Sequence, residues 1–312
     1  MLTATKRRTL ASAATVIGRG LFTGEPAELT IHPAEPADTP RGILFRPFDR
    51  TDVLIPAHAS ALSARPAHPA FDRMPPRNTA LEAAGAAIHT VEHLLAALAA
   101  AGVTDAEIEF HGPEVPIDDG SADIFTAEIH NAGLRTLPGP TPEPIVVREP
   151  FEVVSDDARA RVRFEPLPRA VQPTFTYRLD YGQDAPIPRS EARWDGTPED
   201  FAAHIAPART FCLAREAGQM QALGLFAHLD ASHMLVIEDE GERRGAPLAG
   251  NALRFPDEPA RHKLLDLIGD LALIARPLRA RVIAERSGHA LHHKAARALL
   301  ALPPSSSLSS PA

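Results

Sequence analysis

Two short segments near the start of the chain have the composition and alternation of β-strands. In residues 29–33 the apolar Leu29 and Ile31 flank a polar residue, and residues 42–46 are rich in apolar, strand-forming side chains. Such patterns are typical of strands that bury one face against a core. We predict a strand in each segment and expect the two strands to pair with each other.

A run of alanine and leucine over residues 90–101 predicts an α-helix. Thr90 suits the N-cap position, and Gly102 suits the position just after the last helical turn. A strand over residues 105–110 and a second helix over residues 124–132 are predicted to follow. Residues 60–87 precede the first helix and show no sustained period, which indicates a long loop or insert.

The second half of the chain repeats this order of elements. Residues 137–144 contain four prolines, which prevent a regular element and make this segment a natural linker. Strands followed by helices, twice over, predict an α+β fold of two similar domains, each a β-sheet layered on α-helices. Beyond the linker we predict strands at 145–154, 160–165, 173–180 and 279–285, and helices at 198–206, 258–275 and 289–301.

These patterns divide the chain into four parts. We predict an N-terminal domain over 1–137 with an insert around 60–87, a linker at 138–144, a C-terminal domain over 145–302 with an insert around 212–238, and a disordered tail at 303–312. The last ten residues contain five serines, a composition typical of disordered segments.

Composition narrows the class of protein. The chain has 312 residues, 44% of them hydrophobic, and a formal net charge of -8, which argues against a general nucleic-acid-binding surface. Cys212 is the one cysteine, so an intrachain disulfide and a multi-thiolate metal site are excluded. The N-terminal residues lack the apolar run of a signal peptide, and the apolar stretch around 94–101 is too short to span a bilayer. We expect a cytoplasmic monomer with no stable membrane insertion.

Three segments carry side chains suited to catalysis. His262 and Asp266 are spaced i, i+4, so on a helix they share one face, and Asp270 continues that face by one turn. A histidine and a carboxylate one turn apart supply half of a zinc site, although such a pair is more often an exposed helical contact. Glu92 and His93 begin the alanine-rich helix, where the helix dipole alone would explain a glutamate. A metal ligand beside a general base is the alternative interpretation.

Histidines follow a turn near the C-terminus. Ser287 and Gly288 interrupt the preceding strand and place His289 at a helix start, where a histidine can donate a proton near neutral pH. We expect His292 and His293 to lie on an exposed face of the same helix.

Together, five segments resemble the UDP-3-O-acyl-N-acetylglucosamine deacetylase family, the zinc enzymes of the committed step of lipid A synthesis. They occur in the family's order and span nearly the whole chain. The matching segments are residues 90–93 (TVEH), 113–122 (PEVPIDDGSA), 208–211 (ARTF), 262–270 (HKLLDLIGD) and 287–290 (SGHA).

The resemblance implies a role for each candidate residue, in an active site between the two domains. His93, His262 and Asp266 would hold Zn²⁺, and water would take the fourth position. The substrate would be a small molecule, an acylated UDP-amino sugar that loses its N-acetyl group. The other implied roles are Glu92 as general base, His289 as proton donor, Asp270 as its orienting partner, Thr210 as oxyanion donor, Lys263 as positive charge near the substrate, and Phe211 and Tyr181 as aromatic contacts near the nucleotide.

The chain departs from the family at several positions. Phe22 replaces a histidine of an early turn, and residues 227–233 replace a Gly-Gly-Ser-type run in the insert that forms the acyl-chain passage of the family. Asn78 and Glu165 stand where some members have cysteine and lysine, and Cys212 replaces a common glycine. Two alternatives follow: a deacetylase of a related N-acetylated sugar with a different acyl group, or a non-catalytic substrate-binding or regulatory homologue.

Overall fold

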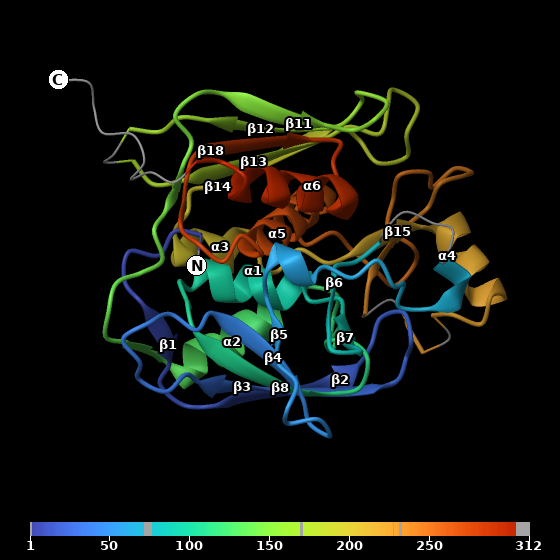
Figure 1. Cartoon of the computed structure of the whole chain (residues 1–312). Coiled ribbons are helices and arrows are strands. Elements are labelled where there is room, and N and C mark those ends of the chain that lie inside the picture. Colours follow the sequence, from blue (N-terminus) through green and yellow to red (C-terminus); the bar gives the residue numbers. More distant parts are fainter. Residues whose placement is uncertain (1, 72–76, 169–170, 227, 231–232, 304–312) are drawn as a thin grey trace.

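Two five-stranded sheets form the outer layers of the molecule, and helices from both halves of the chain lie between them (Figure 1). The structure is a computed structural model that describes residues 2–71, 77–168, 171–226, 228–230 and 233–303. Most of the predicted tail, residues 304–312, therefore lies outside the described residues.

The two sheets have the same topology. In each sheet, the strand that comes last in the chain lies between the second and the third strands, antiparallel to the second and parallel to the third. The first sheet consists, in spatial order, of β2 (Ala14–Arg19), β3 (Pro26–Pro33), β8 (Ala106–His111), β4 (Ile43–Pro47) and β5 (Ile55–Pro56). The second consists of β11 (Phe151–Val154), β12 (Arg161–Glu165), β18 (Arg281–Glu285), β13 (Thr174–Leu179) and β14 (Ser190–Trp194).

This shared topology confirms the predicted α+β fold of two similar units. It also shows that the predicted pairing of residues 29–33 with 42–46 is wrong, because β8 lies between β3 and β4 and pairs with both. The division at residues 138–144 into two domains stays a prediction. One buried hydrophobic cluster runs through both halves of the chain.

Six α-helices are present in the described part of the chain, besides two short 3-10 helices at Ala59–Ala61 and Pro69–Phe71. Their bounds are α1 (Glu92–Ala100), α2 (Asp123–Ala132), α3 (Pro198–His204), α4 (Ala214–Ala222), α5 (Glu258–Ala272) and α6 (His289–Leu300). Helices α5 and α6 pack on the second sheet, α2 packs on the first, and α1 lies against both α2 and α5. No helix of the described residues is long and apolar enough to cross a membrane.

Short strands complete the structure, and two of them show that the first insert is more than a loop. The first insert is not a plain loop, because it includes a hairpin of β6 and β7, and the second insert is built around α4. The short strands are β1 (Arg8–Leu10), β6 (Ala80–Ala83), β7 (Ala86–His89), β9 (Leu134–Thr136), β10 (Ile145–Val146), β15 (Phe211–Leu213), β16 (Leu235–Ile237) and β17 (Leu278–Arg279).

The start of α1 differs from the prediction. Thr90 does not cap the helix; its φ of 61° lies in the left-handed region, and the helix begins at Glu92. The hydroxyl of Thr90 instead donates to Glu114 at 2.9 Å and accepts from Asn78 at 3.1 Å. These buried partners compensate for a backbone conformation that a β-branched residue rarely adopts.

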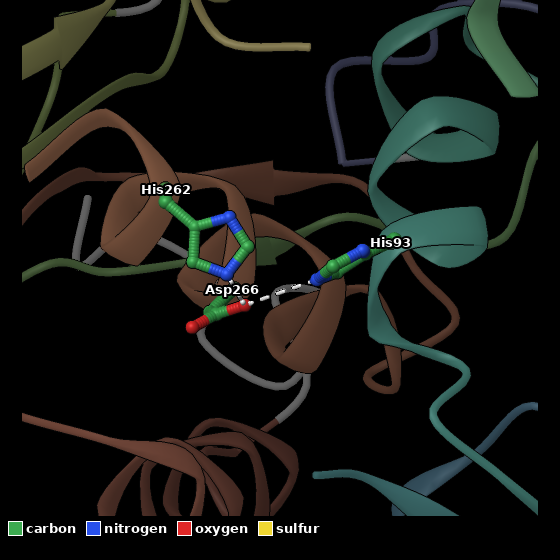
Figure 2. Close-up of side chains that lie close together, drawn as sticks. All are labelled: His93, His262 and Asp266. Carbon is green, nitrogen blue, oxygen red and sulfur yellow. Dashed lines mark ion pairs between the residues drawn. The ribbon is translucent and has the colours of Figure 1, made fainter. Parts of the chain in front are cut away.

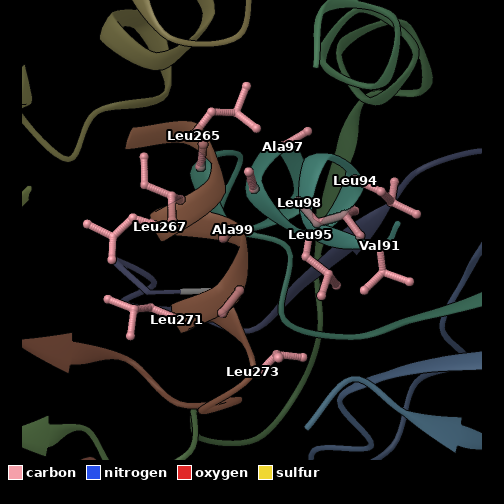
Figure 3. Packing of buried hydrophobic residues seen from close by; sticks show 14 of the residues in the cluster. Val91, Leu94, Leu95, Ala97, Leu98, Ala99, Leu265, Leu267, Leu271 and Leu273 are labelled. Atoms are coloured by element: carbon pink, nitrogen blue, oxygen red, sulfur yellow. The ribbon is translucent and has the colours of Figure 1, made fainter. Parts of the chain in front are cut away.

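Helices α1 and α5 pack at the centre of the molecule. Every residue of α1 is buried, as expected for a helix that is apolar around its whole circumference and covered on all sides. Leucines of both helices lie in one cluster (Figure 3). Contact is closest at Gly269, where an added Cβ would lie 2.0 Å from the carbonyl oxygen of Glu92. Only a residue without a side chain fits there.

We therefore expect Gly269→Ala to destabilise the protein by about 2 kcal/mol or more, because α1 and α5 must separate to admit a methyl group. Gly218→Ala is the matched control, since Gly218 is also helical and a Cβ there meets no atom within 4 Å. The control should be neutral or stabilising by about 0.5–1 kcal/mol. Thermal unfolding checks both variants, and equal midpoints for the two would contradict the prediction.

Candidate active site

Three buried side chains from α1 and α5 converge at the end of the helix pair. His93 extends from the first turn of α1, while His262 and Asp266 lie one turn apart on α5 (Figure 2). Asp266 Oδ1 lies 3.7 Å from His93 Nε2 and 3.4 Å from His262 Nε2. One ligand atom from each of the three residues lies within 4.8 Å of the others. The structure thus brings together the three residues predicted to bind metal.

The protonation of His262 suits a metal ligand. Its Nδ1 lies 3.0 Å from the carbonyl oxygen of Ala208, which can only accept, so Nδ1 carries the proton and Nε2 presents its lone pair. Burial lowers the pKa of His262 to about 3, so the ring stays neutral. Two imidazole nitrogens and a carboxylate form a donor set typical of catalytic zinc sites, which leave one position open. The residues present therefore fit a metal ion.

The positive charge of Lys263 balances the negative charge of the Asp266 carboxylate. The ammonium of Lys263 donates to Asp266 Oδ2 at 2.9 Å. Burial would raise the pKa of Asp266, but the positive charge of Lys263 holds it well below its usual range. The carboxylate is therefore ionised, as a metal ligand requires.

Glu92 lies beside this trio and is almost fully buried, with 3% of its surface exposed. Its Oε2 accepts from the backbone N–H of Thr79 at 3.0 Å, and its Oε1 lies 3.9 Å from His289 Nε2. Burial raises the pKa of Glu92, which makes its carboxylate a stronger base than an exposed glutamate.

His289 and Asp270 form a buried pair opposite Glu92. His289 Nδ1 donates to Asp270 Oδ2 at 2.8 Å. Burial alone would lower the pKa of His289, but the charge of Asp270 and this hydrogen bond raise it to about 9. His289 is therefore a cation at neutral pH in the metal-free protein, and a nearby metal cation would lower its pKa.

A cavity of about 230 Å³ opens on these groups. Thr210 and Phe211 form part of its wall, and Lys263 Nζ lies 5.6 Å from the centre of the Phe211 ring. Phe211 also lines an adjoining cavity of about 660 Å³, together with the predicted residue Tyr181. The predicted residues thus lie around two cavities that share Phe211, apart from Asp270, which lies behind His289.

A buried ion pair fixes the segment that carries Thr210. Arg209 Nε donates to Glu258 Oε1 at 2.8 Å, and both side chains are buried. Glu258 belongs to the first turn of α5, the same helix that holds His262. Because Ala208 accepts from His262 and Arg209 is paired with Glu258, this segment and the ligand helix are held in one geometry.

Phe22, the most conspicuous departure from the family, lies in an aromatic cluster on the cavity wall. Its ring centre lies 5.2 Å from that of Phe71 and 6.0 Å from that of Phe226. Phe22, Phe226 and Cys212 all line the 230 Å³ cavity. Most of the altered 227–233 segment can be placed, but residues 227, 231 and 232 lie outside the described residues.

The expectation that His292 and His293 are exposed is wrong. Both are buried, with 0% and 8% of their surface exposed. His292 Nδ1 lies 2.8 Å from Asp270 Oδ2, and His293 Nε2 lies 2.8 Å from Thr79 Oγ1. Thr79 was not predicted as a site residue either, because it lies in a segment without periodicity.

Two histidines and an aspartate, with a buried glutamate beside them, define a candidate metal centre of the kind that metal-dependent hydrolases use. Comparison with known proteins agrees with this class. The family model LpxC, described as UDP-3-O-acyl N-acetylglycosamine deacetylase, matches residues 7–301. The chain therefore belongs to this family, which confirms the resemblance found in its motifs.

Individual relatives have the same description. The UDP-3-O-acyl-N-acetylglucosamine deacetylase of Thermosynechococcus vestitus is 37% identical over 299 residues, 96% of this chain and 95% of its own length. The protein of that name from Myxococcus xanthus is 35% identical over 95% of this chain and 87% of its own. That of Synechocystis sp. is 35% identical over 93% and 96%.

The geometry of the trio predicts how metal binding depends on its members. We expect metal-stripped protein to take up about one Zn²⁺ per chain. Asp266→Asn and His262→Ala should each bind far less, because each variant loses a donor atom. His130→Ala, which changes an exposed histidine of α2, is the control and should bind like the original protein. Metal content after dialysis measures this, and full uptake by Asp266→Asn would contradict the assignment.

Proposed function

We propose that this protein hydrolyses the N-acetyl group of UDP-3-O-(3-hydroxyacyl)-N-acetylglucosamine and releases acetate, as a zinc-dependent step of lipid A biosynthesis. The observation that carries the proposal is the convergence of His93, His262 and Asp266 beside Glu92, within a chain that matches the family from residue 7 to residue 301. We further propose that the enzyme acts as a monomer in the cytoplasm, where UDP-activated sugars are available.

Amide hydrolysis needs an activated water, stabilisation of the carbonyl oxygen and a proton for the leaving amine. Zn²⁺, when bound by His93, His262 and Asp266, supplies Lewis acidity toward both the water and the carbonyl group. Glu92 takes a proton from the attacking water, since its buried carboxylate is a strengthened base. Its Oε1 lies 3.9 Å from His289 Nε2, close enough for the two groups to act on neighbouring atoms bonded to one substrate carbon.

The remaining roles follow from position around the cavity. His289 donates a proton to the departing amine, and Asp270 keeps its ring oriented. Thr210 lines the cavity and donates a hydrogen bond to the developing oxyanion. Lys263 supplies positive charge near the substrate, while Phe211 and Tyr181 contact the nucleotide in the adjoining cavity.

Removal of the base tests the proposed chemistry. We expect Glu92→Gln to lower kcat for acetate release by about 10²–10⁴-fold, because an amide of similar size cannot take a proton. Chelation should abolish activity, and added Zn²⁺ should restore it. Glu199→Gln, on the exposed first turn of α3, is the matched control. Full activity in Glu92→Gln, or in protein proven free of metal, would contradict the mechanism. No acetate release from the original protein would favour a non-catalytic homologue.

One observation favours the alternative of a different acyl group. The ring of Phe22 packs against those of Phe71 and Phe226, and Phe22 and Phe226 line the 230 Å³ cavity, which limits the space beside the metal ligands. We propose that the acyl chain of the substrate contacts this aromatic cluster and that the cluster restricts its length.

A panel of substrates with acyl chains of increasing length tests this restriction. We expect kcat/KM to fall beyond a certain length in the original protein, and Phe22→Ala to shift that limit toward longer chains because it removes one ring. Phe48→Ala changes an exposed phenylalanine away from the cavity and is the control. Identical length profiles for Phe22→Ala and the original protein would show that the cluster does not limit the chain.

A further inference from the structure

His292 is completely buried and lies next to the His289–Asp270 pair, although it does not line the cavity. It follows His289 by three residues on α6, so both rings are on the same side of the helix. Both histidines direct Nδ1 at the same oxygen, Asp270 Oδ2, at 2.8 Å. The other nitrogen of His292, Nε2, lies 2.9 Å from Ser287 Oγ.

The direction of each hydrogen bond follows from chemistry. Asp270 is ionised: its burial is outweighed by His289 and by hydrogen bonds that hold its pKa well below the usual range. An ionised carboxylate only accepts, so His292 Nδ1 carries a proton. Burial lowers the pKa of His292, which keeps its ring neutral. Nε2 is then an acceptor, and the hydroxyl of Ser287 donates to it.

The second oxygen of Asp270 is held in the same way. Thr79 Oγ1 donates to Asp270 Oδ1, and because its one proton is then used, it accepts from His293 Nε2 at 2.8 Å. Hydrogen bonds from two directions therefore prevent the carboxylate from rotating.

The orientation of this carboxylate matters for His289. The Nδ1 bond to Asp270 directs the opposite nitrogen, Nε2, toward Glu92 and Asp266, each 3.9 Å away. If the carboxylate turned, the His289 ring would turn with it, and Nε2 would leave the reacting side of the cavity. A small displacement of a catalytic group lowers the reaction rate by a large factor.

We propose that His292 is a positioning residue: its Nδ1–H, oriented by Ser287, holds the carboxylate of Asp270 in the position from which Asp270 orients His289. The inference rests on the proposed function only in that His289 acts on the substrate. It assigns to His292 a part in catalysis without contact with the substrate.

Three substitutions of the zinc-loaded, full-length protein separate the two hydrogen bonds of His292. Asparagine places an amide nitrogen near the position of Nδ1, so His292→Asn keeps the donor to Asp270. Glutamine places its amide near Nε2, so His292→Gln keeps only the contact with Ser287, and His292→Phe fills the space with neither.

We expect His292→Asn to retain kcat within about threefold, and His292→Gln and His292→Phe to lose about 10–100-fold in kcat, as for other groups that orient a catalytic residue. KM and zinc content should stay unchanged in all three variants. Equal loss in His292→Asn and His292→Gln, or a change confined to KM or to the thermal midpoint, would overturn the proposal.

A measurement that needs no activity covers the case in which a variant fails to fold or the proposed function is wrong. Nitrogen-15 NMR of the imidazole rings in the zinc-loaded original protein should show His292 as the neutral tautomer with its proton on Nδ1. In Ser287→Ala this tautomer should persist, with a shifted Nε2 resonance, because the donor to Nε2 is gone. A proton on Nε2 in the original protein would overturn the proposal whatever the substrate is.

Discussion

The active-site geometry depends on the close approach of α1 and α5. Gly269 on α5 lies against the carbonyl oxygen of Glu92, the first residue of α1. The residue that we propose as the base therefore contacts the helix that holds His262 and Asp266. A side chain at position 269 would move the helices apart by more than the tolerance of a catalytic site. Close packing here therefore fixes the distance between groups from the two halves of the chain.

The same packing buries charged groups of the site. Their interactions are therefore strong, and each charge needs a partner. Asp266 is paired with Lys263, Asp270 with His289, and Glu258 with Arg209, and all of these side chains are buried except that of Lys263, which is 22% exposed. In such surroundings an unpaired charge would be costly, whereas a paired one holds its partner in a defined direction. These ion pairs hold groups in defined orientations: Arg209 holds the segment with Thr210, and Asp270 holds His289.

The sequence predicted the local parts of this site and missed the parts that depend on tertiary packing. Helix geometry alone places His262 and Asp266 on one face, because they are spaced i, i+4. The family's motifs then indicated the other residues of the site. The burial of His292 and His293 depends on how α6 packs against α5, which no local pattern reveals. Thr90 was predicted to be the N-cap, but its hydroxyl donates a hydrogen bond to Glu114, 24 residues further along the chain. The pairing of β3 with β4 was wrong because β8, from a distant segment, inserts between them.

The repeated topology explains why the site forms where it does. Each half carries a helix shortly before its inserted strand: α1 precedes β8 in the first half, and α5, followed by the short β17, precedes β18 in the second. These two helices meet in the middle layer (Figure 1). Glu92 and His93 lie in the first turn of α1, and His289 begins α6, so the positive ends of two helix dipoles face the cavity. Those dipoles favour negative charge on Glu92 and on a developing oxyanion, but they disfavour a protonated His289. Asp270 reverses that effect, because an ionised carboxylate at 2.8 Å outweighs the partial charge of a helix end. If His289 donates the proton as we propose, the groups that hold Asp270 contribute to catalysis through it.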